Sequence, residues 1–280
     1  MEWWHALILG IVEGLTEYLP VSSTGHLLVT QRLLGIGKSE VADAFAICIQ
    51  AGAIAAVLLL YRQRVRSIAL GFLGRDPAGF RTGINAAVAF LPAAVVGLLF
   101  EKPIKRALFG GDAFGLWPIV AAWFVGGVAI LAFARWHVRK PGEPQSGQSL
   151  EALAWRGALL IGCIQCIAMW PGVSRSLVTI VGGLLAGLSL GAAVEFSFLL
   201  GLITLGAATL LDAKKYGAQM LAEYGPTVLL IGFAAAWLSA AAAVKWMVTY
   251  LQRHGLTLFG WYRIAAALVV GALLLSGKVH

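Results

Sequence analysis

The chain has 280 residues, of which 60% are hydrophobic and only 12% are charged, and its mean hydropathy is +0.85. Because soluble domains carry about 25% charged residues, this composition excludes a soluble globular protein, and it also excludes intrinsic disorder. In a membrane protein, the net charge of +8 indicates basic cytoplasmic loops rather than binding to nucleic acid. We therefore predict an all-α polytopic membrane protein.

Long apolar segments recur along the chain, and two of them are interrupted by polar residues. The first interrupted segment covers residues 6–34 with its break at 19–26, and the second covers 157–188 with its break at 170–176. The remaining apolar stretches each approach the roughly 20 residues that a bilayer requires, and they are 41–61, 84–100, 115–135, 191–211, 226–250 and 257–276.

Proline and glycine at each break predict two short helices that meet at a non-helical tip. Such a tip survives at membrane depth only where it is buried in protein or lines a wet cavity, so we predict two re-entrant helical hairpins. Cys163 and Cys166 lie in an apolar run without a second pair, and we expect both to be small buried side chains.

The two halves of the chain resemble each other. The stretch from Gly10 parallels the stretch from Gly162, and Glu13 then aligns with Gln165. Each half is a hairpin followed by three spans, so the two repeats are inverted with respect to the membrane, as in many transporters. We predict a single membrane domain over residues 1–280, with repeat 1 at about 1–135, a flexible linker at about 136–156 and repeat 2 at about 157–280.

Basic residues predict the orientation of the chain. Loops 62–82 and 136–156 are rich in arginine and lysine and are predicted to be cytoplasmic. Loop 101–114 is then outside despite its basic residues Lys102, Lys105 and Arg106. In this orientation the first hairpin enters from the outside, the second enters from the cytoplasm, and both chain ends lie outside.

Ionisable side chains within apolar segments are costly and are therefore candidate functional groups. Glu13 and Glu17 are four residues apart, so both carboxylates project from one helical face. A divalent cation or a nearby arginine relieves their repulsion, which favours a metal-binding or acid/base role. The alternative is a polar pair that lines water or bonds to a neighbouring helix.

The first tip concentrates hydroxyl groups next to a histidine. Ser22, Ser23 and Thr24, with the free N–H groups of a helix start, suit an anion such as phosphate. His26 can transfer a proton near neutral pH. The alternative is a simple N-cap by one of the three hydroxyls, which is compatible with phosphate binding.

The second tip carries Arg175, and its neighbouring hydroxyl donors are Ser174, Ser176 and Thr179. A guanidinium in an apolar hairpin needs an anionic partner, and its planar fork matches phosphate oxygens. The alternative is an internal salt bridge to Glu13, Glu17 or Glu195. If the tips meet, the combined set suits metal-assisted hydrolysis of a phosphoryl group.

The string EGLTEYLPVSSTGH at 13–26, with WPGVSRS at 170–176 and EFSFLL at 195–200, closely resembles the undecaprenyl-diphosphate phosphatase family. The resemblance covers nearly the whole chain. It implies hydrolysis of undecaprenyl diphosphate to undecaprenyl phosphate and inorganic phosphate, recycling of this lipid carrier for cell-wall synthesis, and bacitracin resistance. It also implies a Mg²⁺ or Ca²⁺ cofactor, a multi-pass location in the bacterial inner membrane and an active site that faces the periplasm.

The resemblance also implies roles for individual residues. Glu13 and Glu17 form the acidic, metal-binding motif, Ser23 and His26 the catalytic pair of the first tip, and Arg175 the phosphate clamp. The remaining phosphate contacts are Ser22, Thr24, Ser174, Ser176 and Thr179. Both Ser23 and an activated water stay open as the nucleophile. Leu177 and Val178 stand where the family usually has glycine and a small residue, which bears on lipid preference.

Other functions fit parts of this pattern. Inverted repeats with re-entrant tips are a transporter plan, so the same cavity could move a polyprenyl phosphate or a phosphate ion. A second superfamily of lipid phosphatases needs a distal histidine and aspartate, which do not follow Arg175 in its segment. The expected partners are a polyprenyl diphosphate and membrane lipids, and small residues at 240–243 are compatible with a homodimer.

Overall fold

The computed structural model describes residues 1–37, 39–108, 115–136 and 147–277, without the side chains of residues 40, 43, 47, 100–108 and 136. Within these ranges the chain is helical, and the only β-pairing is a bridge between Gln148 and Leu188. Residues 137–146 of the predicted linker lie outside the described residues. The basic side chains of loop 101–114 lie outside them too.

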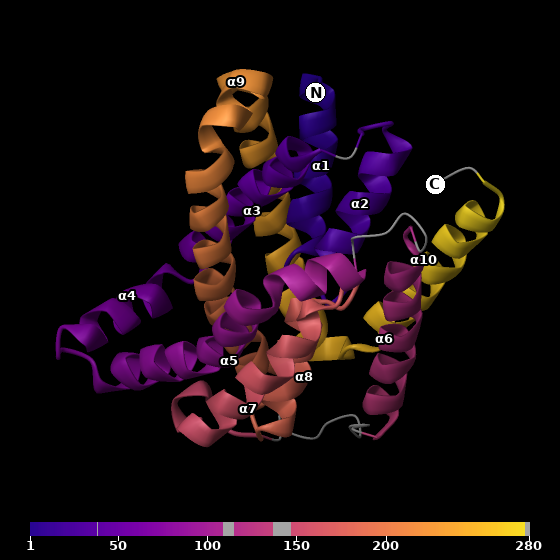
Figure 1. Cartoon of the computed structure of the whole chain (residues 1–280). Helices are drawn as coiled ribbons and strands as arrows, with labels where there is room; N and C mark the ends of the chain where they lie inside the picture. Colours follow the sequence, from indigo (N-terminus) through magenta and orange to yellow (C-terminus); the bar gives the residue numbers. More distant parts are fainter. Residues whose placement is uncertain (38, 109–114, 137–146, 278–280) are drawn as a thin grey trace.

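Each interrupted segment forms two short helices with a non-helical stretch between them (Figure 1). The first pair is α1 (Trp3–Thr16) and α2 (Ser23–Leu33). The second pair is α7 (Trp155–Gln165) and α8 (Arg175–Leu185), with the 3₁₀ turns η1 (Leu150–Ala152) before α7 and η2 (Cys166–Met169) after it. The α-helices are interrupted at 17–22 and 166–174, which overlaps the predicted breaks at 19–26 and 170–176, and each following helix begins earlier than predicted.

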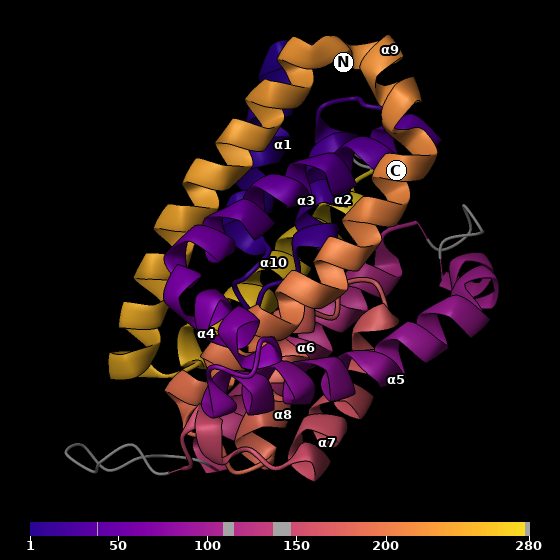
Figure 2. The ribbon, with the colours of Figure 1, turned by 90° about the vertical axis from the view of Figure 1, so that its left-hand side faces the viewer.

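The predicted spans are confirmed as helices. They correspond to α3 (Glu40–Leu60), α5 (Pro77–Leu108), α6 (Trp117–Trp136), α9 (Leu190–His254) and α10 (Thr257–Leu275). α9 contains two predicted spans, and Figure 2 shows that it bends into two arms. The bend lies at Gly225, whose φ of 72° favours glycine, directly before Pro226.

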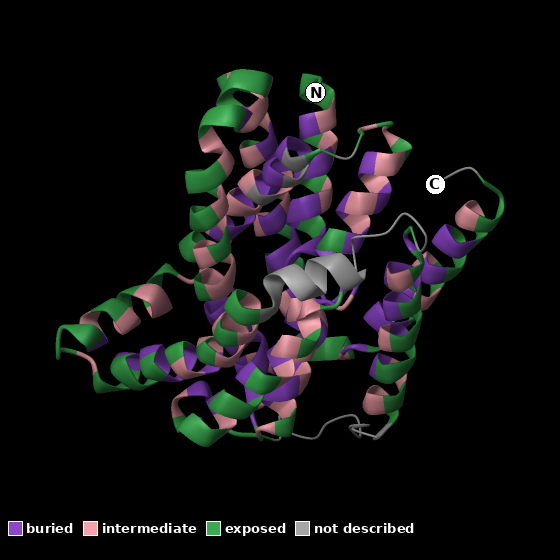
Figure 3. Cartoon of the chain, in the orientation of Figure 1, coloured by how far each residue is buried: buried purple, intermediate pink, exposed green. Residues whose placement is uncertain are grey.

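Four described helices are long and apolar enough to cross a membrane: α5, α6, α9 and α10. Only 28–33% of the most apolar window of each is buried in the protein. Much of the outer side of the helices is exposed (Figure 3), and the exposed side chains include large apolar ones such as Leu98, Leu230 and Leu275, the last of which is 80% exposed. An outer surface of this kind requires lipid instead of water, so the chain is a multi-pass membrane protein.

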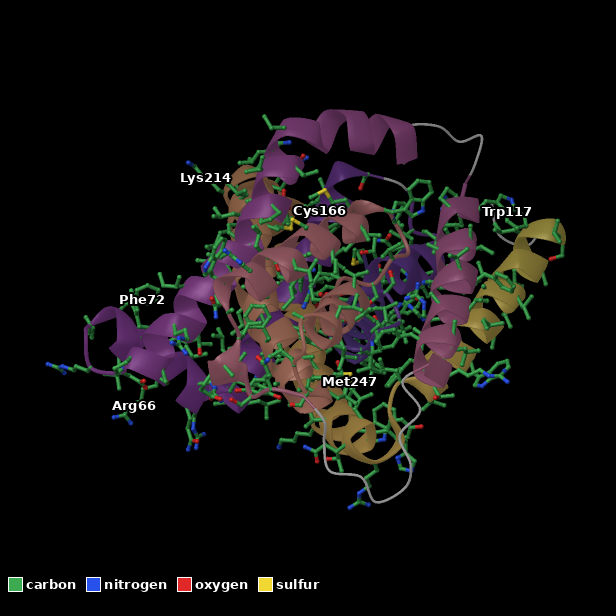
Figure 4. All side chains as sticks on the ribbon, turned by 90° about the horizontal axis from the view of Figure 1, so that it is seen from below. Arg66, Phe72, Trp117, Cys166, Lys214 and Met247 are labelled. Carbon is green, nitrogen blue, oxygen red and sulfur yellow. The ribbon has the colours of Figure 1, made fainter. Side chains whose placement is uncertain are left out.

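The prediction of a loop over residues 62–82 is wrong. Residues Arg62–Phe72 form α4, which bends by 81° from α3 and packs against the start of α5. α4 is an amphipathic helix, and its arginines made the segment resemble a polar loop. Ile68 and Phe72 lie on its apolar face, and the ring centroids of Phe72 and Phe80 are 5.6 Å apart. Arg66 and Phe72 lie at the periphery of the molecule (Figure 4).

The core holds the two helix pairs together. α1 and α3 pack against α9, α6 packs against α10, and α7 packs against α5 and α8. The largest buried cluster joins the two breaks and includes Tyr18, Phe196, Phe198, Leu177 and Ile180. Cys163 is exposed and Cys166 is half-buried, so the expectation that both cysteines are buried is wrong. They lie on the outer side of a helix that is apolar on several faces.

Candidate active site

The two tips contact each other. The Ser176 hydroxyl donates to the carbonyl of Leu19 at 2.8 Å, and the Ser174 hydroxyl lies 3.4 Å from the same oxygen. The hydroxyl oxygens of Ser174 and Ser176 are 2.8 Å apart. Residues from two segments separated by more than a hundred positions thus share one buried junction.

An ion pair crosses this junction. Nη2 of Arg175 donates to Oε1 of Glu17 at 2.8 Å, and the two side chains are 13% and 5% exposed. The internal salt bridge considered as an alternative is therefore present, with Glu17 as the partner. Arg175 also donates from Nη1 to the carbonyl of Ser197 at 3.1 Å. Its Nε has no hydrogen-bond partner among the described residues, which leaves one buried donor for a ligand.

The guanidinium of Arg175 is in close contact with Tyr18 and Gly201. Its guanidinium carbon lies 5.4 Å from the centroid of the Tyr18 ring, a cation–π distance. On another side it lies against Gly201, where an added Cβ would collide with the guanidinium. These contacts restrict the position of the guanidinium, as a phosphate clamp requires.

The carboxylate of Glu17 also accepts a hydrogen bond from Ser23. The Ser23 hydroxyl donates to Oε2 of Glu17, while Oε1 of Glu17 is occupied by Arg175. The side chains of Glu17 and Ser23 are both buried. A serine hydroxyl held by a carboxylate is the arrangement that activates a nucleophile.

Glu13 lies beside Glu17 and is 1% exposed. Its Oε1 has no hydrogen-bond partner in the described part of the chain. No group of three or more His, Cys, Asp or Glu side chains surrounds a metal position within that part. The free oxygen of Glu13, with the carboxylate of Glu17 next to it, fits a Mg²⁺-like cation that takes its other ligands from water and phosphate.

The start of α2 is strained. Ser22 has a φ of 73°, and it is the one non-glycine residue with a positive φ in the described ranges. Such conformations cost about 1–3 kcal/mol and concentrate at functional sites. Ser22 occupies the N-cap position of α2 without a side-chain cap bond, and Thr24 is exposed at the surface. The structure therefore brings Ser23 into the Glu17–Arg175 cluster but leaves Thr24 outside it.

The hydroxyls of the second tip support the backbone there. Ser174 caps α8 by accepting from the N–H of Leu177 at 3.2 Å. Thr179 donates to the carbonyl of Arg175 at 2.8 Å and lies 2.6 Å from the hydroxyl of Ser197. Leu177, one of the two departures from the family pattern, is 6% exposed and packs into the core, so the fold accommodates its bulk.

His26 lies beside this cluster and not within it. Its Nδ1 lies 2.7 Å from the carbonyl of Ser22, and its Nε2 lies 2.8 Å from the hydroxyl of Tyr262. Because a carbonyl only accepts, Nδ1 carries a proton and Nε2 accepts from Tyr262 when the imidazole is neutral. Neither nitrogen contacts Glu17 or Arg175.

Arg263 is a functional candidate that the sequence analysis missed. It is 1% exposed, and its Nη2 donates to the carbonyls of Ala122 at 2.8 Å and Gly172 at 2.9 Å. Its Nη1 lies 3.4 Å from the carbonyl of Pro20. One guanidinium thus joins the backbones of both tips. The available signal was an arginine inside the apolar stretch 257–276.

Glu195 does not reach the cluster. Its Oε1 accepts from Nε of Arg64 at 2.6 Å, and Nη1 of Arg64 donates to Glu151 at 2.8 Å. These residues tie α4, η1 and α9 together behind the second tip. Glu195 is therefore not the partner of Arg175, and this network is structural.

The sequence comparisons identify the family. Residues 6–269 match the family described as bacitracin resistance protein BacA. The chain belongs to this family. The match covers nearly the whole chain and confirms the family resemblance inferred from the motifs at 13–26, 170–176 and 195–200.

Several named relatives match the chain over nearly its whole length. The chain is 46% identical over 276 residues to a protein of Sorangium cellulosum named undecaprenyl-diphosphatase, covering 98% of this chain and 86% of that protein. It is 44% identical over 274 residues to undecaprenyl-diphosphatase 2 of Rhodospirillum rubrum, covering 98% and 96%. It is 42% identical over 283 residues to undecaprenyl-diphosphatase of Nitrosospira multiformis, covering 100% and 99%.

Proposed function

We propose that this chain hydrolyses undecaprenyl diphosphate to undecaprenyl phosphate and inorganic phosphate. It thereby recycles the lipid carrier for cell-wall synthesis and confers bacitracin resistance. The observation that carries this function is the buried junction where Ser23 and Arg175, from opposite halves of the chain, hold the two oxygens of Glu17. The BacA family and the names of relatives at 42–46% identity agree with it.

The substrate's terminal phosphate binds between the two tips. α2 begins at Ser23 and α8 begins at Arg175, so two helix N-termini with free N–H groups lie at the junction, where they favour an anion. Arg175 contributes its guanidinium, whose unpartnered Nε is available. We assign the further phosphate contacts to the buried hydroxyls of Ser22, Ser174, Ser176 and Thr179, whereas Thr24 is exposed outside the cluster.

Ser23 is the nucleophile in this mechanism. Its Oγ forms a bond to the terminal phosphorus while the bond from phosphorus to the bridging oxygen breaks, and that electron pair leaves with undecaprenyl phosphate. Glu17 accepts the serine proton, since Ser23 already donates to it. Water then attacks the phosphoserine, phosphate leaves, and the proton returns to Ser23. The alternative, direct attack by water, forms no phosphoserine.

Glu13 and Glu17 hold the divalent cation, Mg²⁺ or Ca²⁺. The free oxygen of Glu13 supports this assignment, because a buried carboxylate oxygen without a partner is costly. When bound, the cation neutralises phosphate charge. The contact between Nδ1 of His26 and the carbonyl of Ser22 fixes the start of α2. We assign proton transfer with the substrate to His26, on the side of the site where Tyr262 lies.

The chain has an inverted-repeat layout with two re-entrant hairpins. In support, α2 and α8 each have 11 residues and each begins directly after a serine, Ser22 or Ser174. The first helix pair lies in the upper half of Figure 1 and the second in the lower half. We place the protein in the bacterial inner membrane with its active site toward the periplasm, and we assign a homodimer by analogy.

Phosphate release by the purified protein in detergent tests this function. Undecaprenyl diphosphate should yield phosphate, EDTA should stop the reaction, and Mg²⁺ or Ca²⁺ should restore it. Acid quenching during turnover of a substrate with a labelled terminal phosphate should trap label on Ser23, and Ser23→Ala should abolish it. No release by folded protein, with movement of labelled lipid across liposomes, would instead identify a transporter.

A further inference from the structure

We propose that a cavity between α2, α6 and α10 binds the first isoprene units of the lipid substrate, directly beside its diphosphate. This inference rests on the proposed function and specifies where the lipid lies. It assigns Trp123 and Tyr262 to substrate binding, two residues outside the motifs that identified the family.

The cavity has a volume of about 360 Å³, which is within the range of small-ligand sites. Most of its wall is apolar and comes from α2 and α10, including Val29, Val269 and Val270. Its polar side chains are His26, Thr30 and Tyr262, and Trp123 of α6 forms part of the same wall. A ligand that fits this wall has a polar end and a hydrocarbon body.

Two aromatic rings of the wall pack against His26: Tyr262 is stacked on it, and Trp123 is tilted by 39°. The ring centroids of His26 and Trp123 are 4.6 Å apart, and those of His26 and Tyr262 are 5.7 Å apart with an interplanar angle of 15°. Flat apolar faces of this kind suit the planar, methyl-branched units of a polyprenyl chain. Trp123 is only 2% exposed, so its ring is fixed by the surrounding helices.

Trp123 also has an unmet hydrogen bond. Its Nε1 is buried and has no acceptor among the described residues. Buried donors in native proteins nearly always have a partner. An ester oxygen between the diphosphate and the first isoprene unit supplies an acceptor at this end of the cavity, after a small shift of the wall.

The cavity adjoins the phosphate junction. His26 follows Ser23 by three residues on α2, so the two side chains are neighbours on one face of the helix. Tyr262 directly precedes Arg263, whose guanidinium binds the backbones of both tips. A substrate whose terminal phosphate lies at Arg175 therefore has its lipid end directed along the His26 side.

A bulky substitution at Ala265 tests the cavity. Ala265 lines it and is exposed, whereas Ala272, two turns later on α10, is exposed but does not line it. Ala265→Trp should raise KM for undecaprenyl diphosphate and for farnesyl diphosphate by roughly 10-fold or more, with little change in kcat. Ala272→Trp is the matched control and should behave as wild type. Trp123→Phe keeps the ring, removes the N–H and should raise KM several-fold.

The outcomes separate this inference from the proposed function. If the wild type releases no phosphate, the proposed function fails. If the wild type is active and Ala265→Trp and Ala272→Trp have equal KM values, only the cavity assignment fails. Should Ala265→Trp not fold, farnesyl diphosphate with a diazirine on its first isoprene unit provides the test in the wild type.

Cross-linking to α2, α6 or α10 at the cavity supports the inference, and cross-linking elsewhere overturns it. Equimolar phosphatidylglycerol should leave the cross-link intact. Its loss under those conditions identifies an ordinary phospholipid as the occupant and overturns the inference as well.

Discussion

The two tips have similar backbones and opposite chemistry. In both, a serine precedes an 11-residue helix that begins at the junction. The first tip carries carboxylates at Glu13 and Glu17, whereas the second carries a guanidinium at Arg175. The salt bridge between the tips therefore joins unlike charges from like elements. The two tips are therefore complementary in charge although their helices are alike.

The clearest difference between the two halves is at Glu13, with which Gln165 aligns in the sequence. Gln165 is 3% exposed, and neither polar atom of its amide has a hydrogen-bond partner in the described part of the chain. A neutral amide tolerates this burial at a far lower cost than a carboxylate does. The buried carboxylate of Glu13 thus needs a cation or a proton, whereas the buried amide of Gln165 needs neither.

Removing the positive charge of the second tip should have the largest effect. Arg175→Ala deletes the proposed phosphate clamp and leaves Glu17 without its ion-pair partner, so kcat/KM should fall by roughly 10³-fold. Phosphate release in detergent measures this. Arg66→Ala, at the periphery of the molecule (Figure 4), is the control and should retain activity. A folded Arg175→Ala variant with near-wild-type turnover would contradict the two-tip site.

Neutralising the first tip should have the next largest effect. Glu17→Gln should lower kcat by roughly 10²–10³-fold, because Ser23 loses its proton acceptor. Glu13→Gln gives the first tip the residue of the second, and activity should then need far more Mg²⁺. A metal titration of each variant measures this. Gln165→Glu should destabilise the protein without changing the metal requirement. An altered metal requirement in this variant would contradict the assignment of the cation to the first tip.

Displacing the guanidinium without removing it should have an intermediate effect. An added methyl at Gly201 collides with Arg175, and a misplacement of about 1 Å costs on the order of 10² in rate. Gly201→Ala should therefore lower kcat/KM strongly while Arg175 is still present. Gly206, on the same helix, has no atoms near the position of an added Cβ, so Gly206→Ala is the matched control. Equal kcat/KM values for the two variants would show that activity does not depend on the exact position of the Arg175 guanidinium.

The smallest effect is expected behind the second tip, in the network of Arg64, Glu151 and Glu195. Glu151 is 42% exposed, so its pair with Arg64 contributes only about 0–1 kcal/mol to stability. A bond from its own backbone N–H and the pair with Arg64 lower the pKa of Glu151 below its ordinary value of 4.5. The stabilisation is present above that pH and is lost as the pH falls through the lowered pKa.

Thermal unfolding of Glu151→Gln against wild type at pH 7 and at pH 3 measures this contribution. The variant should unfold slightly earlier at pH 7, and the difference should shrink at pH 3. A difference that grows toward low pH would contradict the direction of the pKa shift. Turnover should be unchanged, since the network lies outside the Glu17–Arg175 cluster.

Local patterns in the sequence were sufficient for the membrane helices and for the breaks. Apolar length predicts a span, and a Pro-Gly pair or a Pro followed by serines predicts where a helix ends, because both effects act within a few residues. Because these patterns are local, they also explain why residues 62–72 were wrongly predicted to be a loop. Its arginines dominate the local composition, and only its packing against α5 shows the apolar face.

The sequence by itself determined the chemical groups of the site: two carboxylates, a serine and a histidine around the first tip, and an arginine among hydroxyls around the second. The tertiary structure alone decided the pairing. Arg175 binds Glu17 and not Glu195, His26 turns toward Tyr262, and Arg263 joins the two tips. These contacts span up to 243 residues. A side chain's partner at that separation depends on how whole helices pack, and no local pattern encodes it.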